Sequence, residues 1–245
     1  MVGSPWLPKY IASVTNSLKD KNLNGVVGDQ WSVVLLLMVV ACGGKSKPDQ
    51  QPTPAPTAPL PLAGLASVKV PVLPLTLIGT DETLGWTQLA NQHAALAAAD
   101  SVIGTLLTAR APEVTWVLPE DLRRQARRSP TFATNPDQMG TAILRNDRIE
   151  MVPDPLRAEL RALVAIADAR FALAPAQLVF RRPPPVAAPS ATTAPPAGSG
   201  TAELTVVIVD ARLGRVSWRT VARGDGPDPW TALTRAVKAL TPGLP

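Results

Sequence analysis

The sequence is short of the side chains that perform most enzyme chemistry. Its 245 residues include one histidine, one cysteine and one tyrosine, and aromatic residues make up only 4%. One cysteine excludes an internal disulfide, and one histidine with one cysteine excludes the usual zinc sites. The sequence also has no Gly-x-Ser-x-Gly nucleophile elbow and no phosphate-binding glycine loop. We therefore expect no metal, no cofactor and no enzymatic activity.

Long hydrophobic runs are also missing. The longest is residues 33–41, which holds nine apolar residues and ends at Cys42. A helix needs about 20 apolar residues to cross the core of a bilayer. A run of this length is instead typical of the hydrophobic region of a signal peptide.

The end of this run resembles a known processing site. Val39, Val40, Ala41 and Cys42 resemble the lipobox of bacterial lipoproteins, in which a small residue precedes a cysteine that is acylated and becomes the new amino terminus. The resemblance implies that residues 1–41 are a signal-like leader and that the membrane is contacted through acylated, for example palmitoylated, Cys42. Gly43 stands where some bacteria place an inner-membrane aspartate, so we expect an envelope protein that faces the periplasm, at the outer membrane rather than the inner one. The alternatives are a short uncleaved anchor and a cytoplasmic protein in which the run is a buried element.

Proline divides the remainder of the chain. The sequence has 27 prolines, many of them in two tracts that cannot bury enough apolar surface to fold. We expect a disordered tether over residues 42–66 and a single α/β domain over residues 67–182 and 201–245. Residues 183–200 are then a Pro-rich loop within that domain.

Periodicity predicts a mixed sheet of about five strands packed with three to four helices. Alternating or β-branched segments indicate strands at residues 68–78, 114–118, 171–181, 203–209 and 215–222, the third of them in two parts, 171–173 and 177–181. Apolar residues at three- and four-residue steps predict helices over residues 87–109, 120–128, 155–167 and 229–240. Asp154 and Asp228, each before a proline, are expected to cap the last two helices.

Two segments of the domain resemble those of a family of envelope proteins. The stretch from Val70 to Leu75 is similar to the opening strand of the TolB amino-terminal type of domain. The pattern Asp210-x-Arg212-x-Gly214-x-Val216-x-Trp218 is similar to its late hairpin, with Leu213 in place of the usual threonine. Related domains occur in curli-secretion lipoproteins and in lipoprotein activators of penicillin-binding proteins. The resemblance implies an α/β domain that assembles with another envelope component.

Candidate contact residues come from charge and aromatic character. Arg123, Arg124, Arg127 and Arg128 recur at helical spacing and could form a cationic strip toward an envelope protein or anionic polymer, although such runs are often only a solvated helix face. Trp86 is a further candidate contact residue. The formal net charge of +5 is too small to indicate nucleic acid. The alternative function is an envelope hydrolase with a site near His93 and Asp100, which lie two helical turns apart.

Overall fold

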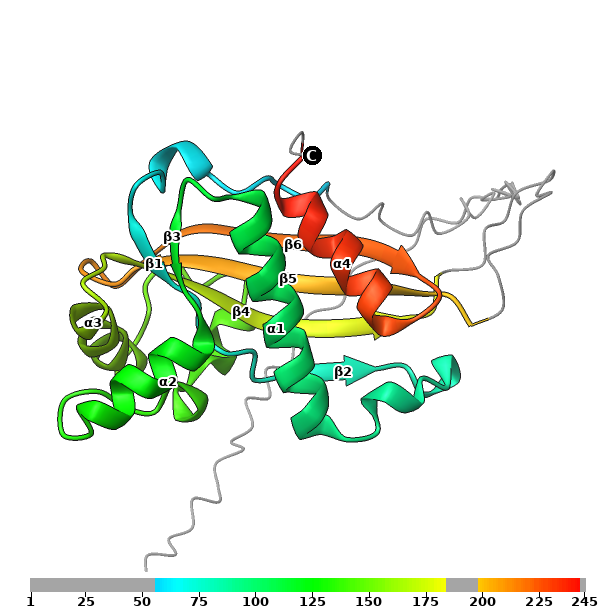
Figure 1. The fold of residues 1–245 in the computed structure, drawn as a ribbon, viewed down its shortest axis with the longest axis horizontal. Coiled ribbons are helices and arrows are strands. Elements are labelled where there is room, and N and C mark those ends of the chain that lie inside the picture. Colours follow the sequence, from blue (N-terminus) through cyan, green and yellow to red (C-terminus); the bar gives the residue numbers. More distant parts are fainter. Residues whose placement is uncertain (1–55, 184–197, 243–245) are drawn as a thin grey trace, which may run out of the picture. The chain divides into compact units, whose positions relative to one another are not determined.

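The computed structural model describes residues 56–183 and 198–242 (Figure 1). The leader, the lipobox and Cys42 lie outside the described residues. The helices are α1 (Gln92–Arg110), α2 (Pro119–Arg128), α3 (Leu156–Ile166) and α4 (Pro229–Leu240). The strands are β1 (Lys69–Pro71), β2 (Ile78–Thr80), β3 (Thr115–Val117), β4 (Phe171–Arg181), β5 (Gly200–Asp210) and β6 (Arg215–Gly226). The predicted α/β class is confirmed. The sequence predicts one strand over residues 68–78, but the structure has β1 there and a separate β2 that begins at Ile78.

The strands form a mixed arrangement centred on the hairpin of β5 and β6. One sheet has the order β2-β4-β5-β6, and β1 pairs with β3 in a second, two-stranded sheet. β2 runs parallel to β4, whereas β5 runs antiparallel to both of its neighbours, β4 and β6. Directly after β1, Val72 makes an isolated bridge to Leu173 of β4, which connects the two sheets.

The helices cover both faces of the sheet. Even-numbered residues of β5 such as Leu204 and Ile208 pack under α1 and α4 in one core cluster. Val207 and Val209 point to the opposite face and join a second cluster with the buried residues of α3. This alternation follows from the two-residue period of a strand. In Figure 1, α1 and α4 cross the sheet side by side, and α2 and α3 lie together at one end.

Helix α4 approaches the sheet closely because β6 carries a glycine beneath it. A Cβ atom at Gly224 would lie 2.6 Å from the carbonyl oxygen of Ala232 and would also collide with the backbone at Ala236. Both alanines are fully buried. The missing side chain on β6 and the small ones on α4 together allow this contact.

The domain begins earlier than predicted. We expected a tether through residue 66, but Leu60 and Leu65 are buried in the main core cluster. The Leu60 amide donates to the carbonyl of Leu240 at 2.8 Å, and the Ala58 amide donates to the hydroxyl of Thr220 at 2.8 Å. The apolar leucines within this proline-rich stretch provide the buried surface that the composition as a whole does not suggest. Residues 184–197 of the predicted loop lie outside the described part and join the paired ends of β4 and β5.

The predicted cap at Asp154 is wrong. Pro155 occupies the cap position of α3 without a side-chain hydrogen bond, and the Asp154 carboxylate instead pairs with Arg157 at 2.6 Å. Asp228 does cap α4, because it accepts hydrogen bonds from the amides of Trp230 and Thr231, each at 3.0 Å. In the described ranges, no helix has the length and apolar character to span a bilayer.

Candidate functional site

Helix α2 carries the predicted contact residues, and its charges follow its own dipole. Pro119 occupies the first turn with Glu120 and Asp121, and Arg127 and Arg128 occupy the last turn. Acids at the amino end and bases at the carboxyl end are the arrangement that a helix dipole favours. Leu122 and Ala126 are buried and hold the helix against the domain. The polar side of α2 therefore has opposite charges at its two ends.

Arg123 points inward and links three segments of the chain. Its Nη2 lies 3.0 Å from Oδ2 of Asp100 on α1 and 2.8 Å from Oδ1 of Asp137, in the loop after α2. Its Nε also donates to both oxygens of Asp137. The hydrogen bond to Asp137 is the main cause that raises the pKa of Arg123. The guanidinium is thus fixed as a structural cation between two carboxylates.

Asp100 is the buried member of this network. Its side chain is 8% exposed, and Oδ1 accepts a hydrogen bond from the Leu75 amide at 2.8 Å. Burial raises the pKa of its carboxyl, and the bonds from Leu75 and Arg123 oppose that effect. Because each oxygen already has a partner, Asp100 serves to tie α1, α2 and the segment before β2 together.

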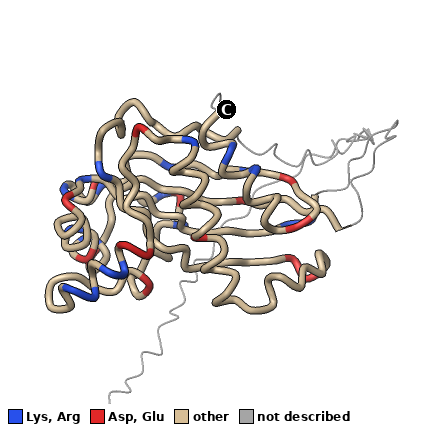
Figure 2. The backbone as a smooth tube through the Cα atoms, viewed as in Figure 1, with Lys and Arg blue, Asp and Glu red and all other residues tan. Residues whose placement is uncertain are grey.

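The other three arginines of α2 lie in different surroundings. Arg124 pairs with Asp121 at 3.0 Å, one turn back on the same helix. Arg127 and Arg128 are exposed, and no ion pair to either is found in residues 56–183 and 198–242. Figure 2 shows basic and acidic segments next to each other along this helix rather than an uninterrupted basic strip. The arginines of α2 without a carboxylate partner among the described residues are therefore the two at its carboxyl end.

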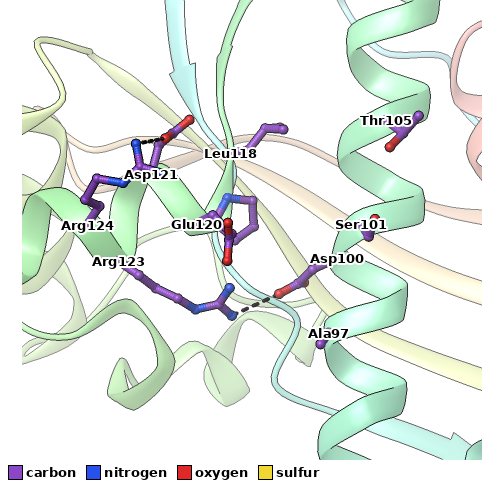
Figure 3. A pocket seen from close by; sticks show the side chains of 10 residues that line it. Ala97, Asp100, Ser101, Thr105, Leu118, Glu120, Asp121, Arg123 and Arg124 are labelled. Atoms are coloured by element: carbon purple, nitrogen blue, oxygen red, sulfur yellow. Dashed lines mark hydrogen bonds and ion pairs between the residues drawn. The ribbon is translucent and has the colours of Figure 1, made fainter.

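A first cleft lies between α1 and the beginning of α2 (Figure 3). It has a volume of about 470 Å³. The α1 wall presents Ala97, Ser101 and Thr105, and the α2 wall presents Glu120. Figure 3 shows the ion pair between Asp100 and Arg123 crossing from one wall to the other.

A second, smaller cleft lies toward the carboxyl end of α2. Its volume is about 290 Å³, and Arg127 contributes to its wall. Arg123, which also lines the first cleft, and Thr134, Asn135 and Gln138 from the segment after the helix complete its polar lining. The two clefts share Arg123 but differ in charge, because the first is lined by carboxylates, Glu120 among them, and the second by none.

The suggested pair of His93 and Asp100 does not form a joint site. His93 is exposed in the first turn of α1 and does not line the cleft that contains Asp100. Asp100 is buried and bonded to Leu75 and Arg123. Within the described ranges, no group of three or more His, Cys, Asp or Glu residues could hold a metal ion.

Trp86 is half-buried and packs within the domain, and its role as a contact residue stays a prediction. Its ring meets Phe180 edge-on with ring centroids 5.3 Å apart. Its indole nitrogen donates to the carbonyl of Gly198 at 3.1 Å, which is a bond that a buried or half-buried indole commonly makes. A Cβ atom at Gly200 would lie 2.6 Å from this ring, so the indole occupies the space that the glycine leaves. The sequence could not show this contact because residues 86 and 200 are far apart in the chain.

The hairpin motif of the family resemblance has a structural explanation. Gly214 has a φ of +68°, a conformation that glycine adopts without strain. The Asp210 carboxylate accepts hydrogen bonds from the amides of Arg212 and Leu213, both at 3.1 Å. Asp210 and Gly214 therefore shape the turn between β5 and β6.

Comparisons with known proteins do not assign the chain to a family. No family model and no curated protein matches its sequence. The LpoB C-terminal domain from Salmonella enterica is similar at 12% identity and a TM-score of 0.33, over 66% of this chain and 83% of that one. Lipoprotein GNA1162 from Neisseria meningitidis gives 16% identity and a TM-score of 0.28, over 64% and 78% of the two chains. A PelC dodecamer from Paraburkholderia phytofirmans is similar at 14% identity and a TM-score of 0.32, over 76% of this chain and 94% of that one. The resemblance to the TolB type of domain stays a prediction.

Proposed function

We propose that this chain is a lipid-anchored protein of the bacterial envelope whose α/β domain binds another envelope component without catalysing a reaction. The anchor is proposed from the sequence, in which nine apolar residues lead into Val39-Val40-Ala41-Cys42. A proline-rich stretch follows and precedes the domain. This order is that of a processed secretory leader with a tether behind it.

The geometry of Asp100 is the observation that supports a binding role over catalysis. A general acid or base must reach the reacting group with a free proton position. Both oxygens of Asp100 are instead engaged by Leu75 and Arg123. His93 lies on the exposed part of α1 and lines neither cleft beside α2. The envelope hydrolase, which is the alternative function, thus lacks the pair of residues on which it depended.

The contact surface is proposed at the carboxyl end of α2. Arg127 and Arg128 are exposed and have no carboxylate partner in the described part of the chain. Guanidinium groups bind carboxylates and phosphates with paired hydrogen bonds. We infer that these two arginines, rather than all four, contact the partner, because Arg123 and Arg124 are held within the domain by their own ion pairs.

Anchoring is tested by fractionating bacteria that express either the wild-type chain or Cys42→Ser. Serine has no thiol to which a lipid could be attached, so the variant should lose its firm association with the membrane. The wild type should remain in the membrane after a high-salt wash, which removes proteins held only by charge. An equal distribution of both proteins would contradict the proposed lipid anchor.

The arginine contact is tested by chemical crosslinking in intact cells. Arg127→Gln with Arg128→Gln should reduce crosslinked species about tenfold, the loss expected when two interface charges worth about 1.4 kcal/mol are removed. Arg148→Gln with Arg215→Gln, two exposed arginines elsewhere on the domain, is the charge-matched control. Crosslinking that is equal in all three proteins would refute the contact at the end of α2.

A further inference from the structure

The cleft between α1 and α2 has the dimensions of a binding site for one side chain or a small ligand. Its volume of about 470 Å³ falls within the range of ligand pockets. Ala97 and Ser101 on α1 are small, which keeps the cleft open between the two helices. Leu118 and Pro119 supply an apolar part of the wall. A ligand here would therefore contact both apolar and polar groups.

Negative charge exceeds positive charge around this cleft. The lining contains three carboxylates and two guanidiniums, from Asp100, Glu120, Asp121, Arg123 and Arg124. A fourth carboxylate, Asp137, binds Arg123 from outside the lining. The surplus is notable because the whole chain has a formal net charge of +5. A cleft of this charge favours a cation over an anion.

Three polar groups in the cleft are available to a ligand. The described residues make no hydrogen bond to the Glu120 carboxylate or to the hydroxyls of Ser101 and Thr105. Figure 3 places Glu120 on the α2 wall, with Ser101 and Thr105 facing it from α1. Carboxylate and hydroxyl oxygens all accept hydrogen bonds. They match a ligand with several N–H donors and a positive charge.

We propose that this cleft binds a lysine or arginine side chain of a partner polypeptide, with Glu120 as its counter-ion and Ser101 and Thr105 as additional acceptors. The apolar stem of such a side chain fits against Leu118 and Pro119, while its charged end meets the carboxylate. The surplus of carboxylates opposes binding of an anionic polymer or lipid headgroup. The cleft lining contains no aromatic residue on which a sugar ring could stack.

This site is independent of the lipid anchor and of the arginine contact. Glu120 lies in the first turn of α2 and Arg127 in the last turn, so the two contacts lie at opposite ends of the helix, although Arg123 lines both clefts. A polypeptide that carries both lysine or arginine and acidic side chains could occupy both clefts at once. The loss of either contact alone would leave the other measurable.

The proposal is tested by NMR titration of the ¹⁵N-labelled full chain with Nα-acetyl-arginine methylamide and Nα-acetyl-lysine methylamide. Saturable shifts are expected at amides of residues 97–105 and 118–124 at millimolar probe concentrations. Glu120→Gln should weaken binding about fivefold, the upper range for one exposed ion pair. Glu113→Gln, which removes an exposed carboxylate from outside the cleft, should bind the probes like the wild type.

One anionic probe and one uncharged probe serve as comparisons for the cationic probes. Nα-acetyl-glutamate methylamide and N-acetylglucosamine should not shift the same amides. The proposal is overturned if the cationic probes give no saturable shifts there, if Glu120→Gln binds them as tightly as the wild type, or if either comparison probe binds as strongly. Because Glu120 is exposed, the spectrum of the variant should keep the dispersion of a folded chain.

Discussion

Asp100 and Asp137 both bind the guanidinium of Arg123, but Asp100 is much more deeply buried than Asp137. The Asp100 side chain is 8% exposed, and that of Asp137 is 43% exposed. An exposed ion pair contributes little to stability because water solvates both charges. Removing one partner of a buried pair is costly, because the remaining groups lose their bonds without regaining water. The two carboxylates should therefore differ strongly in their effect on folding.

Asp100→Ala should lower the free energy of unfolding by about 3 kcal/mol. The variant leaves the Leu75 amide without its acceptor and removes the inner partner of Arg123. Asp137→Ala is the matched control, because it also removes a partner of Arg123, and it should cost no more than about 1 kcal/mol. Urea unfolding followed by circular dichroism measures both. Equal losses in the two variants would show that Asp100 is not a buried tie between the helices.

Asp228 makes the stability of α4 depend on pH. Hydrogen bonds from the hydroxyl and amide of Thr231 lower the pKa of its carboxyl from the ordinary 3.8. A lowered pKa in the folded state stabilises the fold fully above pH 3.8, and this contribution is lost as the pH falls through the lowered pKa.

The Asp228 carboxylate is tested by unfolding the wild type, Asp228→Asn and Asp228→Ala at several pH values. The alanine variant should lose about 1 kcal/mol at neutral pH because it has no cap. Asparagine retains a capping oxygen without a charge, so the advantage of the wild type over it should shrink as the pH is lowered below 3.8. If the difference in unfolding free energy between the wild type and Asp228→Asn stays constant down to the lowest pH at which both fold, the cap does not depend on charge.

The sequence predicts the capping role of one aspartate correctly and that of another wrongly. Asp154 and Asp228 both precede a proline and a helical pattern, yet only Asp228 caps its helix. The difference arises from the backbone at the proline, which is the cap residue of α3 but lies inside the first turn of α4. A dipeptide signal does not specify which of these positions the proline occupies.

Among the elements, the helices were the most predictable. α2 has a proline, two acids and then four arginines, which marks both of its ends in sequence, and its predicted bounds are nearly those observed. The strands were harder. The stretch predicted as one strand over residues 68–78 forms β1 and β2 with different partners. The strand predicted in two parts, residues 171–173 and 177–181, is continuous in β4, and a register shift between Pro175 and Gln177 explains the break in its alternation.

The contact between α4 and β6 depends on Gly224. Gly224→Ala should lower the free energy of unfolding by about 2 kcal/mol, because the new methyl group would overlap the backbone of α4. Gly64→Ala is the control, since a Cβ atom there meets nothing within 4 Å, and it should change stability by less than about 0.5 kcal/mol. Thermal unfolding measures both variants. A Gly224→Ala chain as stable as the control would mean that α4 can move away from the sheet without loss.

For the molecule as a whole, the α/β class follows from periodicity, but the clefts do not. Asp100, Arg123 and Asp137 meet through tertiary packing of α1, α2 and the following loop. Each lies in an ordinary polar pattern in the sequence, so their spacing gives no signal of a network. The prediction of a cationic strip did not include this network. Helical spacing places arginines along one helix but does not show which of them a carboxylate from a neighbouring segment neutralises.

The proposed anchor gives the whole molecule its place in the cell. If Cys42 is the mature amino terminus, the domain is attached to a membrane through residues 43–55, and α2 can meet other components of the envelope. The described domain begins by residue 56, where the chain lies against β6 through the hydroxyl of Thr57 and the carbonyl of Val221. The length of chain between lipid and domain is then shorter than the predicted tether of residues 42–66.

The central claim is tested most directly by the intact mass of the chain purified from bacterial membranes, with Cys42→Ser measured beside it. The account predicts a mature protein that begins at Cys42 and carries the mass of attached acyl chains, and a variant that lacks that mass. A wild-type chain that retains residues 1–41 and carries no acyl group would contradict the account.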